Sequence, residues 1–199
     1  MSYDNKRIAG ILFFVGVVQF ILAVVIAEAL YSGYSVGQQA VSDLGNWSKA
    51  GTSAPIFDAS VILLGTLVIA GAYFIQRAFK SRSFTSLLVI GGVAIVGLGV
   101  FAEDVFLPAH MVFSLTTFVF AAASAIMSYK FEKSPLSNVS VVLGLVTVLA
   151  ILLSTFGFYL GIGYGGMERF IIYPSLLWLL GFGAYLIGES SNAASTSKV

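Results

Sequence analysis

The sole histidine of the chain, His110, stands close to acidic residues in the sequence. Pro108 marks the first turn of a predicted helix, so His110 should lie in that turn, with Ser114 one turn further on the same face. Glu103 and Asp104 should end the preceding helix, whose negative dipole end disfavours their ionisation, while the positive end favours a neutral imidazole. A neutral histidine near carboxylates of raised proton affinity could do acid–base chemistry or ligate a metal. The alternative is a wet interface in which these side chains only hydrogen-bond the loops.

Two more acidic residues fall within apolar stretches. Glu28 lies near the end of one hydrophobic run, and Asp58 lies in the first turn of the next predicted helix. Acidic residues at membrane depth usually face a bundle interior or a water-filled cavity. The helix dipole favours Asp58 but gives Glu28 no such help, which makes Glu28 the more informative of the two. A structural polar contact remains the alternative for both.

The adjacent charged pair Glu168-Arg169 follows a glycine-rich stretch. Neighbouring side chains diverge on a helix, so each needs its own partner. The guanidinium could bind a lipid phosphate or an anionic substrate. The simplest expectation, however, is an ion pair with an acidic residue of the same face: Asp43, Glu103 or Asp104.

Composition indicates which solvent surrounds these residues. The chain has 199 residues, of which 58% are hydrophobic and 10% charged, whereas a soluble domain carries roughly 25% charged residues. Such a chain cannot cover a water-exposed surface, and its continuous apolar runs favour helices over a barrel. A net charge of +1 gives no basic surface for nucleic acid. The absence of cysteine excludes disulfides and thiolate metal sites. We therefore predict an all-α polytopic membrane protein.

Six apolar windows meet or approach the roughly 20 residues that a helix needs to cross the hydrocarbon core. We predict that they form a single six-transmembrane-helix bundle, followed by a flexible cytoplasmic tail at 189–199. The six windows are 8–30, 56–75, 84–102, 109–129, 139–160 and 170–188.

Positive charges predict the orientation. Lys49 and Arg169 fall on one face of the six-span arrangement, and all other cations fall on the opposite face: Lys6, Arg7, Arg77, Lys80, Arg82, Lys130, Lys133 and Lys198. We predict that the protein lies in the cell membrane. The positive-inside rule then places both termini in the cytoplasm. Most acidic residues gather with His110 on the extracytoplasmic face: Glu28, Asp43, Asp58, Glu103, Asp104 and Glu168.

Three motifs together resemble a known family. They are the segment 41–45, which reads Val-Ser-Asp-Leu-Gly, the end of the third span running into His110, and the segment 166–174, which reads Gly-Met-Glu-Arg-Phe-Ile-Ile-Tyr-Pro. The arrangement resembles the domain-of-unknown-function 998 family of prokaryotic, often archaeal, six-helix membrane proteins. The resemblance implies the fold, a membrane location and importance for Asp43, His110, Glu168 and Arg169. It implies no activity.

The outer polar residues support several functions. The first is binding or transport of a lipid headgroup or small solute in a pocket formed by the nine residues Glu28, Asp43, Asp58, Glu103, Asp104, His110, Ser114, Glu168 and Arg169. The second is a lipid hydrolase or transferase with a metal held by His110, Glu103 and Asp104. The third is a structural subunit of a membrane complex or a homo-oligomer, for which glycines 157, 161 and 165 predict a close helix contact. The fourth is a haem protein with His110 as an axial ligand. Membrane lipids are partners in every case.

Overall fold

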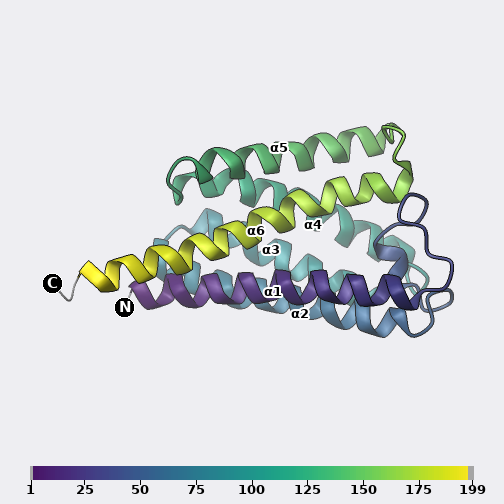
Figure 1. The fold of residues 1–199 in the computed structure, drawn as a ribbon, viewed down its shortest axis with the longest axis horizontal. Helices are drawn as coiled ribbons and strands as arrows, with labels where there is room; N and C mark the ends of the chain where they lie inside the picture. Colours follow the sequence, from purple (N-terminus) through teal and green to yellow (C-terminus); the bar gives the residue numbers. More distant parts are fainter. Residues whose placement is uncertain (1, 197–199) are drawn as a thin grey trace.

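The structure is a computed structural model that describes residues 2–196. Within this range the chain forms six long helices and two short 3-10 helices, with no strand (Figure 1). Lys198, which belongs to the predicted cytoplasmic tail, lies outside the described residues. In chain order the elements are α1 (Ser2–Leu30), η1 (Ser42–Gly45), α2 (Ser53–Phe79), α3 (Arg82–Val100), α4 (Leu107–Met127), η2 (Ser128–Lys130), α5 (Leu136–Thr155) and α6 (Gly163–Thr196).

All six long helices have the length and apolarity needed to cross a membrane. The shortest, α3, has 19 residues, which gives about 29 Å at 1.5 Å per residue and matches a hydrocarbon core of roughly 30 Å. A helix satisfies every backbone polar group within itself, which lipid requires. The prediction of an all-α, six-helix membrane protein is confirmed, and the exposed apolar faces of its helices contact lipid.

The helix boundaries differ from the apolar windows because helices continue beyond the hydrocarbon core. α1 begins six residues before the predicted window at 8–30, and α6 extends to Thr196, well into the predicted tail. α5 ends earlier than predicted, at Thr155, because Gly157 and Gly161 take positive φ angles of 75° and 76° and form a turn. The predicted close helix contact by these glycines is therefore wrong.

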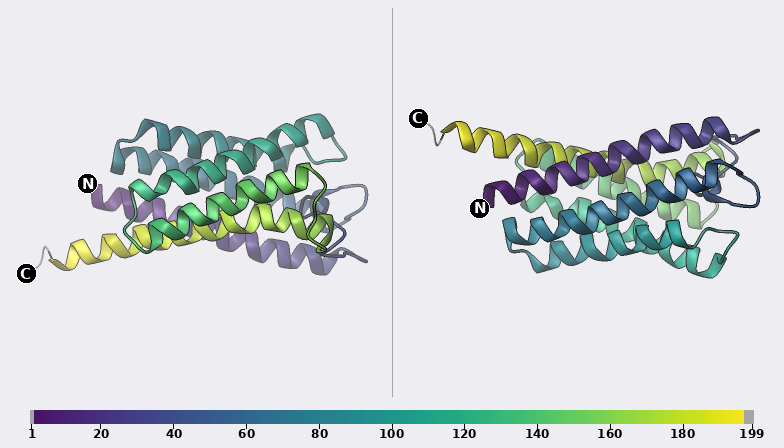
Figure 2. Two further views of the ribbon diagram at one scale, coloured as in Figure 1. Left: turned by 90° about the horizontal axis from the view of Figure 1, so that it is seen from above. Right: turned by 90° about the horizontal axis from the view of Figure 1, so that it is seen from below.

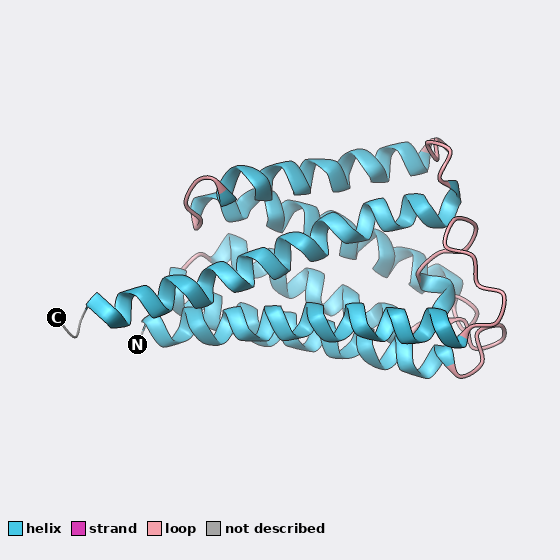
Figure 3. Ribbon diagram, in the orientation of Figure 1, coloured by secondary structure: helices cyan, strands magenta, loops and turns pink. Residues whose placement is uncertain are grey.

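The helices form a ring in which each packs on its neighbours in sequence, and α6 closes the ring on α1 (Figure 2). Both termini lie at one end of the bundle, which we call the terminal end (Figure 1). The α1–α2, α3–α4 and α5–α6 connections lie at the opposite end, which we call the loop end, and the α1–α2 connection is the longest (Figure 3). Because α4 also touches α6, α5 lies outside these two helices.

Aromatic packing fills the terminal half of the ring. Phe182 of α6 lies with its ring centroid 6.2 Å from that of Phe13, 5.8 Å from that of Phe84 and 6.0 Å from that of Trp178. α1 and α6 cross closely here, since a Cβ on Gly10 would lie 2.6 Å from the Gly183 carbonyl oxygen. The candidate site lies in a cavity that runs from the loop end towards this aromatic cluster.

Candidate functional site at the loop end

A cavity lies inside the ring, lined mainly by α2, α3, α4 and α6 and by none of α5. Its empty volume is about 1040 Å³, part of it open to solvent. On α4 the lining positions follow one helix face at intervals of three or four residues: His110, Ser114, Thr117, Ala121 and Ser124. At 1.5 Å per residue, the distance from the first to the last is about 21 Å. The cavity is therefore elongated along the bundle axis.

Polarity is concentrated at the loop end of this cavity. Ser42, Asp58, His110, Ser114 and Glu168 line that end. The remaining walls are mostly leucine, valine, isoleucine and phenylalanine, and the deepest α6 positions include Trp178. The cavity thus brings together four of the nine predicted pocket residues: Asp58, His110, Ser114 and Glu168. Arg169 is not part of its lining.

The short helix η1 covers the loop end of the cavity. Val41 and Leu44 are almost fully buried, with exposed fractions of 1% and 0%. The Glu168 carboxylate holds this segment: it accepts hydrogen bonds from the Val41 amide, from the Ser42 amide at 3.4 Å and from the Ser42 hydroxyl at 3.0 Å. Asp43 accepts from the Ala40 amide at 2.8 Å, outside the cavity lining. The motif at 41–45 is therefore a structural cover whose inner side meets the cavity.

Asp58 lies beneath this cover with an exposed fraction of 7%. Its Oδ2 accepts a hydrogen bond from the Trp47 indole N–H at 2.7 Å. A Cβ on Gly45 would lie 2.4 Å from Asp58 Oδ1, so only glycine permits this approach of η1 to the carboxylate. α2 begins at Ser53, and Asp58 therefore lies in its second turn rather than its first.

His110 faces the cavity in a fixed orientation. Pro108 occupies the first turn of α4, as predicted. The ring Nδ1 lies 3.0 Å from the Phe101 carbonyl oxygen. A carbonyl can only accept, so Nδ1 carries the proton of this hydrogen bond, and in the neutral ring Nε2 carries the lone pair. Among the described residues Nε2 has no hydrogen-bond partner, which leaves it available to a molecule in the cavity.

Glu103 and Asp104 do not join His110. α3 ends at Val100, so both lie in the α3–α4 loop. Asp104 accepts from the Trp47 amide at 3.2 Å and the Ser48 amide at 2.8 Å. Although burial acts in the opposite direction, these hydrogen bonds lower the pKa of Asp104, contrary to the predicted rise in proton affinity. Glu103 lines none of the cavity. These two carboxylates are thus loop residues rather than companions of the imidazole.

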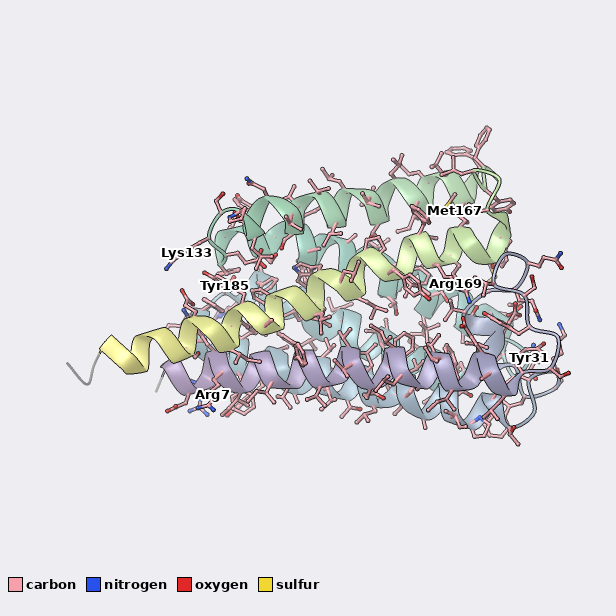
Figure 4. The ribbon with its side chains drawn as sticks, viewed as in Figure 1. Arg7, Tyr31, Lys133, Met167, Arg169 and Tyr185 are labelled. Carbon is pink, nitrogen blue, oxygen red and sulfur yellow. The ribbon has the colours of Figure 1, made fainter. Side chains whose placement is uncertain are left out.

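Arg169 pairs with Glu28, and not with an acidic residue of the loops as predicted. Its Nη2 donates to Glu28 Oε1 at 2.5 Å and to the Tyr34 hydroxyl at 2.8 Å. Its Nη1 donates to three carbonyl oxygens, those of Val36 at 2.9 Å, Gly165 at 3.0 Å and Gln39 at 3.3 Å. Figure 4 shows Arg169 on α6 facing the α1–α2 loop. The guanidinium, which is 6% exposed, ties this loop to α1 and α6.

Tyr34 also belongs to this network, although no sequence pattern singles it out. Its hydroxyl donates to the Ala40 carbonyl at 2.8 Å while it accepts from Arg169. Burial raises the pKa of Tyr34 to about 12, although the nearby guanidinium lowers it in part. Thr117 and Trp178 were also missed; the helical repeat from His110 would have indicated Thr117, whereas no local signal indicates Trp178.

The donor set gives no support to a metal centre. Among residues 2–196, no group of three or more histidine, cysteine, aspartate or glutamate side chains is close enough to hold a metal ion. The metal site of His110 with Glu103 and Asp104 therefore stays a prediction. The cavity instead presents hydrogen-bond acceptors above an apolar wall, an arrangement suited to a molecule with a polar and an apolar part.

Comparison with known proteins agrees with the fold. The profile of a family described as "Protein of unknown function (DUF998)" matches residues 14–185, a range that includes parts of all six long helices. No curated protein matches the chain, and no solved structure matches it. The family match covers most of the chain and takes in all three motifs on which the resemblance was based. The chain is an integral membrane protein of the DUF998 family.

Proposed function

We propose that this protein binds a lipid or lipid-like molecule in the cavity, with the polar group at the loop end and the apolar chain along the bundle axis. The observation that carries this proposal is the position of Asp58, His110 and Glu168 at one end of a cavity whose remaining walls are mostly apolar, with hydroxyl groups but no further charged side chain among the described residues. A small solute would use only the polar end, whereas a lipid would use both parts.

We further infer that the loop end faces the outside of the cell membrane, and that both termini are cytoplasmic. The terminal end carries Arg7 and Lys133, as Figure 4 indicates, together with the cations of the α2–α3 turn. Of the cations within residues 2–196, the loop end carries only Lys49 and the paired Arg169. Because the positive-inside rule is strongest for short loops, this distribution favours an extracytoplasmic cavity.

Quenching of tryptophan fluorescence tests the proposal. Trp178 lines the cavity and is 3% exposed, so a bromine-bearing amphiphile dissolved in the surrounding lipid does not reach it. We expect such probes to quench Trp178 in protein reconstituted into nanodiscs, with the Trp178→Phe variant identifying its share of the signal. Ala121→Phe should fill the cavity and abolish quenching, while Ala123→Phe, on the same helix but outside the lining, should leave it unchanged. Quenching that is equal in these two variants would refute the proposal.

A second function, hydrolysis or group transfer on the bound lipid, is favoured by one observation. The His110 Nδ1–H donates to the Phe101 carbonyl and Nε2 has no hydrogen-bond partner among the described residues, which is the arrangement of a general base. If the protein is such an enzyme, His110→Gln should retain lipid binding but abolish turnover of the bound lipid. No contact of the described residues favours the structural-subunit or haem functions over these two.

A further inference from the structure

The acceptor groups at the loop end of the cavity point to the charge of its ligand. We propose that the cavity takes a single-chain amphiphile whose polar group is a protonated amine, in preference to a phosphate or a carboxylate. This inference rests on the proposed function, because it names the class of molecule for the same cavity.

The first support is the charge of the lining. Asp58 and Glu168 both line the cavity, whereas no lysine or arginine in the described part of the chain does. Arg169, which follows Glu168 in sequence, directs its guanidinium to Glu28, Tyr34 and backbone carbonyls instead. Among the described residues, neither cavity carboxylate has an ion-pair partner. Buried carboxylates are normally paired, so an incoming cation would supply the missing charge, whereas an anion would be repelled.

The second support is the hydrogen-bonding character of the polar end. The Ser42 hydroxyl is already donated to Glu168, and the Trp47 indole N–H is donated to Asp58 Oδ2. Asp58 Oδ1 and His110 Nε2 accept no hydrogen bond from the described residues. These two positions are acceptors, and the Ser114 hydroxyl at the same end can accept as well as donate, so the polar end matches a group with several N–H donors. An ammonium group has three donors and no acceptor.

The third support is an unpartnered hydroxyl in the wall. Thr117 is 8% exposed, lines the cavity and has no hydrogen-bond partner for its hydroxyl. A threonine on a helix can satisfy itself by donating to the carbonyl four residues earlier. Thr66, Thr116 and Thr155 do so, at 2.8 Å, 2.7 Å and 2.8 Å. Thr117 does not, so this residue of the cavity lining carries a buried hydroxyl that has no partner among the described residues, a condition that native proteins seldom leave uncompensated.

The test compares three bromine-bearing probes that share one alkyl chain and differ in the polar group: a primary amine, an alcohol and a phosphate monoester. Binding is read from quenching of Trp178 in nanodiscs of uncharged-headgroup lipid, which removes any surface-charge effect on partitioning. We expect the amine to bind at least about tenfold more tightly than the phosphate, because like charges are disfavoured across a desolvated contact. The alcohol should fall between them.

Neutral variants assign the preference to the two carboxylates. Asp58→Asn together with Glu168→Gln should reduce the preference for the amine to within about twofold, since each amide keeps the size but not the charge. Glu103→Gln, a loop-end carboxylate outside the lining, is the matched control and should keep the full preference. Because Glu168 also holds η1, Asp58→Asn alone is measured as well; it should lose part of the preference even if the double variant is unstable.

The outcomes separate the two proposals. If no probe quenches Trp178 in the native protein, the proposed lipid binding itself fails. If all three probes quench equally and Ala121→Phe abolishes the effect, lipid binding stands and the amine preference is overturned. Tighter binding of the phosphate, or an amine preference that persists in both the single and the double variant, also overturns it.

Discussion

Arg169 of α6 and Glu28 of α1 form a partly buried ion pair, with Nη2 and Oε1 2.5 Å apart, between residues separated by 141 positions. The pair lies at the junction of the first and last helices of the ring. Since the same guanidinium binds three carbonyl groups, it connects ring closure to the shape of the α1–α2 loop. That loop supplies η1, which covers the cavity. Arg169 does not line the cavity. It affects the cavity by holding the α1–α2 loop that carries η1.

Replacement of Arg169 by methionine should destabilise the protein strongly. It leaves the Glu28 carboxylate without its cation and removes the donor from three carbonyl groups. Breaking a buried ion pair on one side costs about 3–5 kcal/mol. Arg169→Lys should lose less, because it keeps the charge, but it cannot reproduce the planar set of five donors. Denaturant unfolding in mild detergent, followed by circular dichroism, measures both effects.

Lys133→Met provides the control for this prediction. Its ammonium group lies 3.9 Å from Glu189, and the Lys133 side chain is 80% exposed. An exposed ion pair contributes about 0–1 kcal/mol. A loss for Arg169→Met no larger than that for Lys133→Met would show that the guanidinium network contributes nothing to stability.

Two glycines of α6 should respond in opposite ways to the same substitution. A Cβ on Gly165 would lie 1.9 Å from the Gln39 carbonyl oxygen, so Gly165→Ala must displace the loop backbone, at a cost of about 1–3 kcal/mol. Gly188 has no atom within 4 Å of such a Cβ. Gly188→Ala should therefore stabilise the helix by about 0.5–1 kcal/mol. Thermal unfolding of the two variants compares them directly, and equal shifts would contradict the close approach of this loop to α6.

These contacts show where sequence-based prediction succeeded and where it could not. Six helices follow from hydropathy, because lipid leaves the backbone few alternatives. The inward position of Asp58 follows from its place in an apolar run. The pairing of Arg169 with Glu28 could not be predicted, because the path of the α1–α2 loop depends on close backbone contacts such as that of Gly165 with Gln39. Periodicity carries no information about such contacts in an irregular loop.

The stabilities of two threonine-to-valine variants test whether the Thr117 hydroxyl in the cavity wall lacks a hydrogen-bond partner. Thr147 is fully buried, and its hydroxyl contacts the Ser175 hydroxyl at 3.1 Å. Thr147→Val should cost about 1 kcal/mol, because it leaves that serine without a partner. Thr117→Val removes a hydroxyl that has none, so in delipidated protein it should be neutral or stabilising by about 1–3 kcal/mol. Equal destabilisation of the two variants would indicate that the Thr117 hydroxyl is satisfied.

Cysteine labelling should establish the orientation of the bundle. The chain contains no cysteine, so single substitutions give an unambiguous signal. Ser48→Cys introduces a thiol at an exposed position of the loop end, and Ser83→Cys introduces one at an exposed position of the terminal end. In intact cells a membrane-impermeant maleimide should label Cys at position 48 only, whereas permeabilised cells should show labelling at both. The reverse pattern would place the cavity on the cytoplasmic side.

Glu132 should make stability depend on pH in the direction opposite to most carboxylates. It lies at the terminal end with an exposed fraction of 8%. The Ser128 hydroxyl accepts from the Trp178 indole N–H at 2.9 Å and lies 2.8 Å from the Ala125 carbonyl and 3.1 Å from Glu132 Oε2. Since this hydroxyl has one hydrogen, the Ala125 carbonyl and the Glu132 carboxyl group share it, and the bond that Ser128 donates to Oε2 only partly offsets the burial of Glu132.

Burial raises the pKa of Glu132, although hydrogen bonds with Ser140 and Ser128 lower it in part. The folded protein therefore retains the carboxyl proton to a higher pH than the unfolded chain does. Stability should be greatest below the unfolded value of about 4.3 and should fall as pH rises towards the folded pKa. Glu132→Gln, which imitates the neutral acid, should be more stable than the native protein at pH values above that range, and the difference should vanish in acid.

Glu189→Gln is the matched control at the same end of the bundle. Glu189 accepts a charged hydrogen bond from Lys6 at 2.7 Å, so its amide variant should lose stability at neutral pH rather than gain it. Unfolding measured from pH 4 to pH 8 distinguishes the two, because the stability difference between native and variant protein must change with pH in opposite senses. If Glu132→Gln instead loses stability at neutral pH, Glu132 is ionised in the folded protein.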